Sequence, residues 1–394
     1  MSFFNRFPFT LNIQTDRDEV PLPGVDQRSQ VGEAVRECES VVCNKLVRKV
    51  PQTREIFDGE WGGREVIVKL FLGGKRSEGR VKREWDGLKK LQALGIFAPL
   101  SLFRGKTEEG AFALVVEKIL DAETVRELWA GSEELARKIE WLRLIFIELA
   151  GQHEKGVIQK DLHFGNFLLK GGDLYSLDPA EMKFSASPVA RKAAVSHLAT
   201  LTTHMLRIDS ETVWELLDLY MKRRGWRLDK KDVILFEEKL AAYSRIWLKK
   251  TLKKNLRSNS RLIRLNGPGF TAIFDRGFQS GADPVEFIEN IDRLMKQGHG
   301  VKTCVNKATT FRLSWNGRKF TATAWEHTLI FSRLAHFITG TPARRGWLEG
   351  YRLLLLGHET PKPLACIEKG PKGFRNRSFL ITEIPKPAEP EITN

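Results

Sequence analysis

The stretch that decides the fold is Asp161–Asp178, which reads DLHFGNFLLKGGDLYSLD. Two apolar runs flank the pair Gly171-Gly172, and this pattern predicts a two-strand hairpin with the glycines at its turn. A register in which paired residue numbers sum to about 343 places Asn166 opposite Leu177. Because cross-strand neighbours lie roughly 5 Å apart, Asn166 and Asp178 are expected to meet just beyond the strand ends.

Asp161 lies in the loop immediately before this hairpin, so three oxygen-bearing side chains are expected to converge. The order D-x-x-x-x-N followed by a second aspartate is the arrangement that phosphoryl-transfer sites use. Asp161 would accept the proton of the acceptor hydroxyl, while Asn166 and Asp178 would bind Mg²⁺ against nucleotide phosphates. The alternative is that these residues only cap turns and end a strand. His163 either orients the loop by hydrogen bonding or is an ordinary polar residue.

Two charged residues further upstream occupy apolar positions. Lys69 lies within VIVKLF, where a lysine is costly to bury unless it is paired. Glu84 falls in the apolar stripe of a helix expected over 78–94. A Lys69–Glu84 pair would explain both positions and would aim the lysine at the α- and β-phosphates. The alternative for Lys69 is an edge-strand lysine that reaches solvent.

The rest of a nucleotide site is less evident. No G-x-G-x-x-G precedes the lysine, so the glycine-poor segment 50–63, VPQTREIFDGEWGG, is the candidate phosphate cover. The strand expected over 112–120 leads into a hinge between two lobes. Position alone predicts that the backbone of Glu117 and Ile119 binds adenine.

The order of expected elements predicts an α+β fold with two unequal lobes, a small β-rich N-lobe and a helical C-lobe. A second, degenerate α+β domain that resembles the N-lobe follows. The expected boundaries are an irregular lead-in 1–40 (with a turn at PLPG), a catalytic domain 41–240 (N-lobe about 41–119, C-lobe about 120–240), a basic helix and linker 241–300, a repeat 301–386 and a tail 387–394.

The second domain is inferred from an internal repeat. Residues 83–100 match residues 345–364 at a constant offset of 262, and strand-like segments on both sides also match. Thr323 stands where Lys69 would map, and Gly346 stands where Glu84 would map. Since no catalytic half follows, the copy is predicted to transfer no phosphate itself. It could instead dock against the first domain or bind a glycan or a partner.

The chain carries 64 Lys and Arg against 49 Asp and Glu, a net charge of +15, which favours acidic partners. Between Lys239 and Phe274 there are nine Lys or Arg and no Asp or Glu. This segment is either a solvated helix and linker or a docking surface for an anionic membrane or a phosphorylated glycan. Nucleic acid is an unlikely partner, because no aromatic-basic recognition module is present.

Four cysteines form no C-x-x-C pair and no metal-ligand spacing, which favours a reducing cytosol. The N-terminal residues lack the pattern of a signal peptide, and no apolar run approaches the roughly 20 residues of a membrane span. The chain is therefore expected to be soluble and cytoplasmic, or peripheral at a membrane surface.

These motifs resemble those of the lipopolysaccharide-core kinases, the Kdo and heptose kinases of Gram-negative bacteria, which have a protein-kinase-like fold. The resemblance spans roughly 41–235 and rests on GREVIVKLF, REWDGLKKLQALGI, VIQKDLHFGNFLL and LYSLDPAEM. It implies transfer of the ATP γ-phosphate, with Mg²⁺, to a sugar hydroxyl of a phosphorylated glycolipid at the cytoplasmic membrane face. DLHFGN is also similar to aminoglycoside and choline phosphotransferases.

Two departures bear on the acceptor. Gln159-Lys160 replaces the His-Arg that precedes the base in typical protein kinases, and Pro179-Ala180 replaces the Phe-Gly after the metal-binding aspartate. No Ala-Pro-Glu segment follows, so a small acceptor is favoured over a protein. The alternatives are a kinase for a protein or another small metabolite, and a pseudokinase scaffold that binds nucleotide without transferring phosphate.

Overall fold

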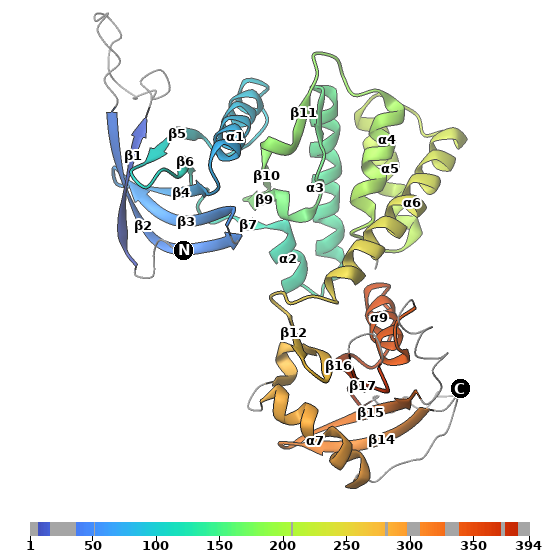
Figure 1. Cartoon of the computed structure of the whole chain (residues 1–394). Coiled ribbons are helices and arrows are strands. Elements are labelled where there is room, and N and C mark those ends of the chain that lie inside the picture. The colour runs from blue at the N-terminus through green and yellow to red at the C-terminus, as the bar shows by residue number, and fades with distance from the viewer. Residues whose placement is uncertain are drawn as a thin grey trace, which may run out of the picture. The chain divides into compact units, whose positions relative to one another are not determined.

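The structure of the chain is a computed structural model that describes residues 7–15, 37–50, 52–205, 208–279, 283–297, 308–327, 339–371 and 375–384. The chain divides near residue 240 into two compact units. Unit 1 holds the residues up to 239 other than 205–207, and unit 2 holds the remainder. Both units mix helices and sheets, and the described residues include eight α-helices (Figure 1).

The N-terminal part of unit 1 is a closed barrel with the strand order β1-β2-β3-β4-β6-β5. Its strands are β1 (Phe9–Thr15), β2 (Glu37–Val50), β3 (Arg54–Trp61), β4 (Arg64–Phe71), β5 (Ser101–Thr107) and β6 (Phe112–Glu117). Strands β3 and β4 form a hairpin that turns at Gly62 and Gly63, and both glycines have positive φ. This conformation favours residues without a Cβ atom.

The prediction that residues 1–40 form an irregular lead-in is wrong for strand β1. Strand β1 pairs with both β2 and β5, and so it closes the barrel. Leu11 and Ile13 point into the barrel and are fully buried. The alternation of FTLNIQT is the period of a half-buried strand, and it was overlooked. The PLPG turn lies outside the described residues.

Helix α1 (Lys75–Ala93) packs against the outside of this barrel, and it confirms the helix expected over 78–94. Its apolar stripe shares a core with Phe71 of β4 and with Leu114 and Val116 of β6. The stripe residues are Val81, Trp85, Leu88 and Leu91. This packing sets the distance between Glu84 on the helix and Lys69 on the sheet.

The rest of unit 1 is mainly helical (Figure 1). Its helices are α2 (Val125–Gly131), α3 (Leu135–Glu154), α4 (Arg191–Thr202), α5 (Ser210–Arg223) and the first part of α6 (Lys230–Lys254). Short strands run beside them: β7 (Glu123–Thr124), β8 (Val157–Gln159), β9 (Phe167–Lys170), β10 (Asp173–Ser176) and β11 (Met182–Phe184). The predicted hairpin is confirmed with its register, since β9 pairs with β10 from Lys170↔Asp173 to Phe167↔Ser176.

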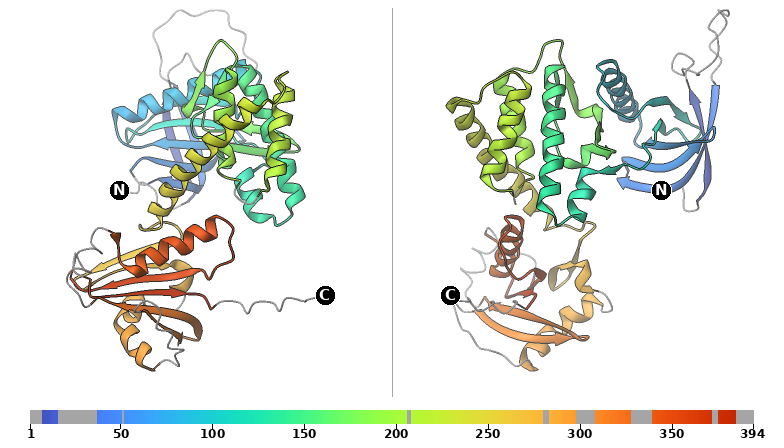
Figure 2. Two further views of the ribbon diagram at one scale, coloured as in Figure 1. Left: turned by 90° about the vertical axis from the view of Figure 1, so that its right-hand side faces the viewer. Right: turned by 180° about the vertical axis from the view of Figure 1, so that it is seen from behind.

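Unit 2 is built on one antiparallel six-stranded sheet with the order β12-β13-β16-β17-β15-β14. The strands are β12 (Leu262–Gly267), β13 (Phe270–Asp275), β14 (Ala308–Trp315), β15 (Arg318–Glu326), β16 (Pro363–Lys369) and β17 (Arg377–Thr382). Helix α7 (Pro284–Gln297) covers one face, and helix α9 (Pro342–Leu355) covers the other (Figure 2). Each face has its own apolar core.

The prediction that residues 241–300 are a basic helix and linker is wrong beyond the helix. Strands β12 and β13 belong to the six-stranded sheet, and α7 contributes to the core on one face of it. The run FTAIFD ends in four consecutive buried residues, 272–275, and pairs on both sides, so it is a central strand rather than a linker. The tail 387–394 lies outside the described residues, as do 298–307 and 328–338 within the expected repeat.

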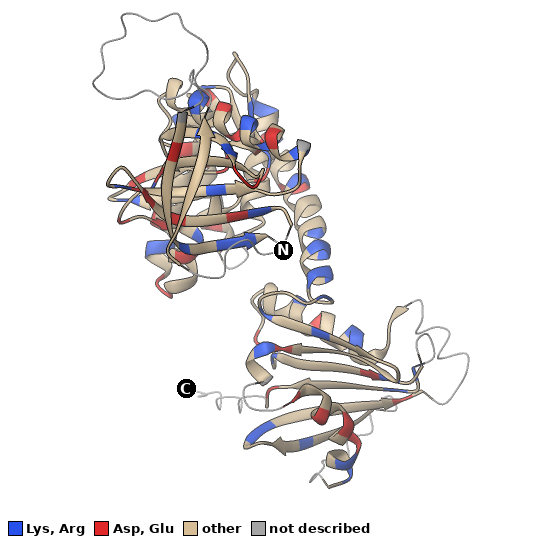
Figure 3. Cartoon of the chain, turned by 60° about the vertical axis from the view of Figure 1, so that its left-hand side comes forward, with Lys and Arg blue, Asp and Glu red and all other residues tan. Residues whose placement is uncertain are grey.

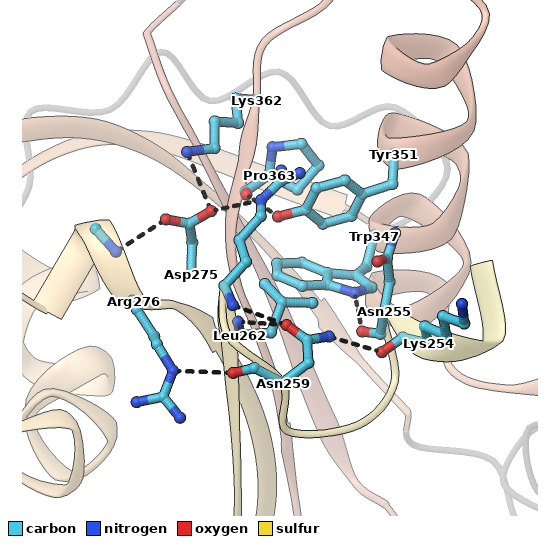
Figure 4. A network of polar contacts seen from close by, with 12 residues as sticks. Lys254, Asn255, Asn259, Leu262, Asp275, Arg276, Trp347, Tyr351, Lys362 and Pro363 are labelled. Carbon is cyan, nitrogen blue, oxygen red and sulfur yellow. Dashed lines mark hydrogen bonds and ion pairs between the residues drawn. The ribbon is translucent and has the colours of Figure 1, made fainter. Parts of the chain in front are cut away.

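Polar contacts join the end of α6 to this sheet (Figure 4). The indole N–H of Trp347 on α9 donates to the carbonyl of Asn255 at 3.0 Å. Buried Asp275, at the end of β13, forms an ion pair with Lys362 at 3.0 Å. Its other oxygen accepts from the backbone of Gly277 at 3.0 Å. These buried groups are therefore satisfied within the unit, as buried polar groups generally are.

Both units contain four strands in the same order. The order β3-β4-β6-β5 in unit 1 corresponds to β14-β15-β17-β16 in unit 2. In the sequence, α1 lies between β4 and β5 of unit 1, and α9 lies between β15 and β16 of unit 2.

Candidate active site

Lys69 and Glu84 form an ion pair between β4 and α1. Glu84 is almost fully buried, and the Lys69 side chain is only 12% exposed. Burial alone would lower the pKa of Lys69, but Glu84 and Asp178 outweigh it and raise that pKa. Lys69 therefore stays charged inside the protein, held by carboxylates that come from two distant parts of the chain.

Asp178 lies against this pair. Its Oδ1 atom is 3.8 Å from the Lys69 Nζ atom. Burial raises the pKa of Asp178, but Lys69, Arg54 and Arg48 outweigh burial and hold that pKa below its usual range. Asp178 has φ 52° and ψ 53°, a left-handed conformation that aspartate tolerates better than most residues. The amide of Leu177 donates to the carbonyl of Asn166 at 2.8 Å, and this hydrogen bond holds the turn that carries Asp178 beside Asn166.

Arg54 is a site residue that the sequence analysis missed. Its Nη1 atom lies 3.8 Å from Glu84 Oε2 and 3.8 Å from Asp178 Oδ1. The hairpin register offered a signal, because Ile56 pairs with Lys69. Arg54 lies two residues before Ile56 and so points to the same face of the sheet as Lys69.

Asn166 is buried and is tied to Asp161. The Asn166 side-chain amide donates to the Asp161 carbonyl at 2.7 Å. Since the amide nitrogen is engaged, a metal contact from Asn166 would have to use Oδ1. The carboxylate of Asp161 is 74% exposed, as a base that meets an incoming hydroxyl needs to be.

His163 contacts the Asp161 carboxylate from within the loop. Arg126 on α2 lies 3.2 Å from His163 Nδ1, and arginine can only donate. The Nδ1 atom must therefore accept, which puts the proton of the neutral ring on Nε2. That atom lies 3.6 Å from Asp161 Oδ2. Burial and then Arg126 lower the pKa of His163, in keeping with a neutral ring. Of the two roles left open, the contacts favour orientation of the loop.

Gln159, which stands two residues before Asp161, points into the interior. Its amide donates to Gln152 on α3 at 3.0 Å. Gln152 in turn donates to Ser176 of the hairpin at 2.7 Å. The residue that replaces the usual histidine therefore ties α3 to both sides of the loop that carries Asp161.

A chain of hydrogen bonds leads from helix α5 to the same loop. His197 Nε2 donates to the Gln159 carbonyl at 2.6 Å, so its Nδ1 must accept from His153 Nε2 at 2.8 Å. His153 Nδ1 then accepts from the Tyr220 hydroxyl at 2.6 Å. The guanidinium of Arg224 donates to that hydroxyl at 3.0 Å. Burial lowers the pKa of both histidines, which keeps the chain neutral at its centre. His153 therefore has a structural role in this hydrogen-bond chain.

Helix α1 and the turn after Asp178 touch at Gly87. A Cβ atom on Gly87 would lie 2.7 Å from Pro179 Cβ and 3.0 Å from its carbonyl oxygen. The absence of a side chain therefore permits the helix that carries Glu84 to lie directly on the segment that carries Asp178.

The structure places Glu117 and Ile119 at the end of β6 and just beyond it. The amide of Lys118 donates to Glu65 of β4 at 3.2 Å, whereas the amide of Glu117 donates to Leu100 at 2.9 Å. The Glu117 backbone groups therefore face away from β4, because the N–H and C=O of one strand residue point to the same side. Their contact with adenine stays a prediction.

A metal site here would need ligands besides the protein. Among the residues that the structure describes, no group of three His, Cys, Asp or Glu side chains is placed to hold a metal ion. The oxygens of Asn166 and Asp178 suit Mg²⁺, which takes one or two protein ligands and completes its shell with phosphate and water. The donor set therefore fits a metal that arrives with a nucleotide.

Comparison with known proteins gives a partial similarity to a kinase. No family model matches this chain. The chain is 34% identical over 118 residues to a probable serine/threonine-protein kinase of Encephalitozoon cuniculi. The match covers 29% of this chain and 22% of the relative, so the chain spans about a fifth of that protein.

This similarity indicates a kinase-like protein. It does not support the narrower resemblance to kinases of lipopolysaccharide core sugars. Among the described residues, no helix is long and apolar enough to cross a membrane.

Proposed function

We propose that unit 1 is an ATP-dependent phosphotransferase of protein-kinase-like fold, with a sugar hydroxyl of lipopolysaccharide core as acceptor. The observation that carries the phosphotransferase proposal is the cluster of Lys69, Glu84 and Asp178. These residues come from a strand, a helix and a turn that are distant in sequence, and Asp178 lies 3.8 Å from Lys69. A buried charge pair is weak evidence for stability, so this arrangement is better explained by ligand binding.

In this mechanism Lys69, held by Glu84, binds the α- and β-phosphates. Asn166 and Asp178 hold the metal ion, and bound Mg-ATP supplies the phosphoryl group. Asp161 takes the proton of the acceptor hydroxyl as the hydroxyl oxygen bonds to the γ-phosphorus. The bond between that phosphorus and the bridging oxygen then breaks, and ADP leaves. Positioning and charge stabilisation supply most of the catalysis in such reactions.

The test compares wild type, Asp161→Asn and a matched control, Asp173→Asn, which changes an exposed aspartate in the same hairpin. Each is incubated with Mg-ATP and with core oligosaccharide, a protein acceptor or small alcohols, and products are detected by mass. We expect wild type and Asp173→Asn to phosphorylate the oligosaccharide, and Asp161→Asn to lose at least about a hundredfold in rate.

Other outcomes separate the alternatives. Transfer only to the protein or to a small alcohol would refute the sugar acceptor and retain the kinase. Binding of Mg-ATP with equal, negligible product from wild type and Asp161→Asn would favour a nucleotide-binding scaffold. Failure of the wild type to bind Mg-ATP would refute both readings.

We also propose that the basic end of α6 binds an anionic membrane surface and so brings the enzyme to a glycolipid acceptor. Lys and Arg recur along this end of the helix (Figure 3), and Lys249, Lys250, Lys253 and Lys254 are exposed. Leu252 and Leu256 pack into the core beneath α9, so the attraction would be mainly electrostatic, roughly 1 kcal/mol per lysine. Binding to vesicles with anionic lipid should fall with salt and after the four lysines are changed to glutamate. Unchanged binding would refute the role.

A further inference from the structure

The turn between β2 and β3 lies where a phosphate cover is expected, yet it has little to offer a phosphate through its backbone. Residues 50–53 read VPQT and contain no glycine. The amide of Thr53 already donates to the Val50 carbonyl at 3.1 Å, and the Thr53 carbonyl accepts from Leu72 at 2.9 Å. The Thr53 amide is therefore not available to a phosphate at this position, and a side-chain donor would strengthen the binding of a phosphate there.

Arg54, the next residue, provides such a donor. Its side chain is 19% exposed, and its guanidinium lies 5.9 Å from the centre of the Phe71 ring. At 3.8 Å, the contacts with Glu84 and Asp178 are too long to be hydrogen bonds. Among the described residues, none accepts a hydrogen bond from this guanidinium, which carries five N–H donors in a planar fork. That fork matches the oxygens of a phosphate group.

The charges around Arg54 also favour an anion. Lys69 and Arg54 lie near the carboxylates of Glu84 and Asp178, and the pKa of Asp178 is lowered by Lys69, Arg54 and the exposed Arg48. Three cations against two anions leave an excess of one positive charge in this group. A metal ion at Asp178 would repel Lys69 and Arg54 from that carboxylate. Lys69 would keep its ion pair with Glu84, whereas Arg54 contacts Glu84 only at 3.8 Å and would be free to turn to a phosphate.

We propose that Arg54 is a phosphate-binding residue that takes the place of the backbone amides of a glycine-rich turn. Without nucleotide it lies between Glu84 and Asp178. With nucleotide it turns from Asp178 to the terminal phosphates, and Arg48 adds a weaker, solvent-screened attraction. This inference rests on the proposed function, because it assumes that a polyphosphate occupies the site.

The experiment measures binding by calorimetry for wild type, Arg54→Met, Arg54→Lys and the control Arg64→Met. Arg64 is exposed at the other end of the β3–β4 hairpin, so the control makes the same chemical change away from the site. The ligands are Mg-ATP, inorganic tripolyphosphate and adenosine. Adenosine has no phosphate and reports whether the rest of the site is intact.

We expect Arg54→Met to weaken Mg-ATP and tripolyphosphate about tenfold or more, the size typical of a charge-assisted hydrogen bond. Adenosine binding should not change. Arg54→Lys should fall between, because it keeps the charge and loses the fork, and Arg64→Met should match wild type. Unchanged affinity of Arg54→Met for both phosphate ligands would overturn the inference, and so would an equal loss for adenosine.

The two proposals can fail separately. If the wild type does not bind Mg-ATP, the proposed function is wrong. In that case, if Arg54→Met were the only variant to lose tripolyphosphate binding, the result would still support an anion site at Arg54. If the wild type binds Mg-ATP and all three variants bind it equally, only the role of Arg54 is wrong. Thermal unfolding without ligand checks that each variant is folded.

Discussion

The Lys69–Glu84 pair gives the sharpest prediction, because its two halves should be costly to remove singly and cheap to remove together. Lys69→Met leaves Glu84 buried, with Arg54 3.8 Å away as the nearest remaining cation. Glu84→Leu leaves Lys69 only 12% exposed, with Asp178 3.8 Å away. Breaking a buried pair costs about 3–5 kcal/mol. Because Arg54 remains near Glu84, we expect Lys69→Met to lower the free energy of unfolding by about 2–3 kcal/mol. Because Lys69 is partly exposed and remains near Asp178, we expect Glu84→Leu to lower it by about 1–2 kcal/mol.

The double variant should behave differently. Glu84 lies on α1 between the buried residues Val81 and Leu88, so a leucine there continues the apolar stripe. Lys69→Met places an apolar side chain on the facing strand. Replacement of a buried pair by apolar residues is often neutral, and we expect the double variant to lie within about 1 kcal/mol of wild type. Because the single effects sum to about 3–5 kcal/mol, the implied coupling energy is at least about 2 kcal/mol.

Hydrogen exchange under increasing denaturant is the appropriate assay, since it reports each unit separately. Peptides from α1 and β4 give the free energy of opening in unit 1, and peptides from α9 and β17 serve as the internal control. All three variants should lose Mg-ATP binding. If the double variant is destabilised by the sum of the single effects, the reasoning that the pair serves ligand binding rather than stability is refuted.

Two other perturbations follow from the contacts. Burial lowers the pKa of His153; the unfolded chain therefore binds the proton first, and as pH falls below about 6.5 unit 1 should lose up to about 1.4 kcal/mol per pH unit for this group. Denaturant-dependent hydrogen exchange from pH 8 to 5 checks this, and a flat profile would contradict it. Gly87→Ala should push α1 away from Pro179, at a cost of about 1–3 kcal/mol, and weaken Mg-ATP binding. Gly79→Ala on the same helix meets only an ordinary contact and should stabilise it slightly; equal melting temperatures for the two variants would contradict the role of Gly87.

The local sequence pattern was sufficient to predict the parts of the site that depend on strand pairing and on charge pairing. The glycine turn and the period of two fixed the register of the β9–β10 hairpin, which places Asn166 opposite Leu177. The Lys69–Glu84 contact could be predicted because each residue violates the apolar pattern of its own element. A single violation is ambiguous, whereas two violations of opposite charge constrain each other.

Contacts that depend on how helices pack could not be predicted in this way. His197 and Tyr220 lie on different helices, and nothing in their local sequence shows that both point toward His153. The strands of residues 262–275 were missed for another reason. They lie at the C-terminal end of the basic run 239–274, which by charge alone indicates a solvated helix and linker, although charge says little about whether a strand forms.

The two units show why a shared strand order does not carry the same chemistry. At the positions that correspond to Lys69 and Glu84, unit 2 has Thr323 and Gly346. The Thr323 hydroxyl pairs with Thr310 at 3.0 Å. A Cβ atom on Gly346 would lie 2.8 Å from Leu380 Cδ2, so α9 lies directly against the sheet. A buried charge pair requires space for two long side chains. It also carries a desolvation cost, which a bound anion can offset. At Gly346, the described part of unit 2 leaves no such space between α9 and the sheet. The comparison therefore connects the Lys69–Glu84 pair, which lies between α1 and β4, with the phosphates that we propose unit 1 binds.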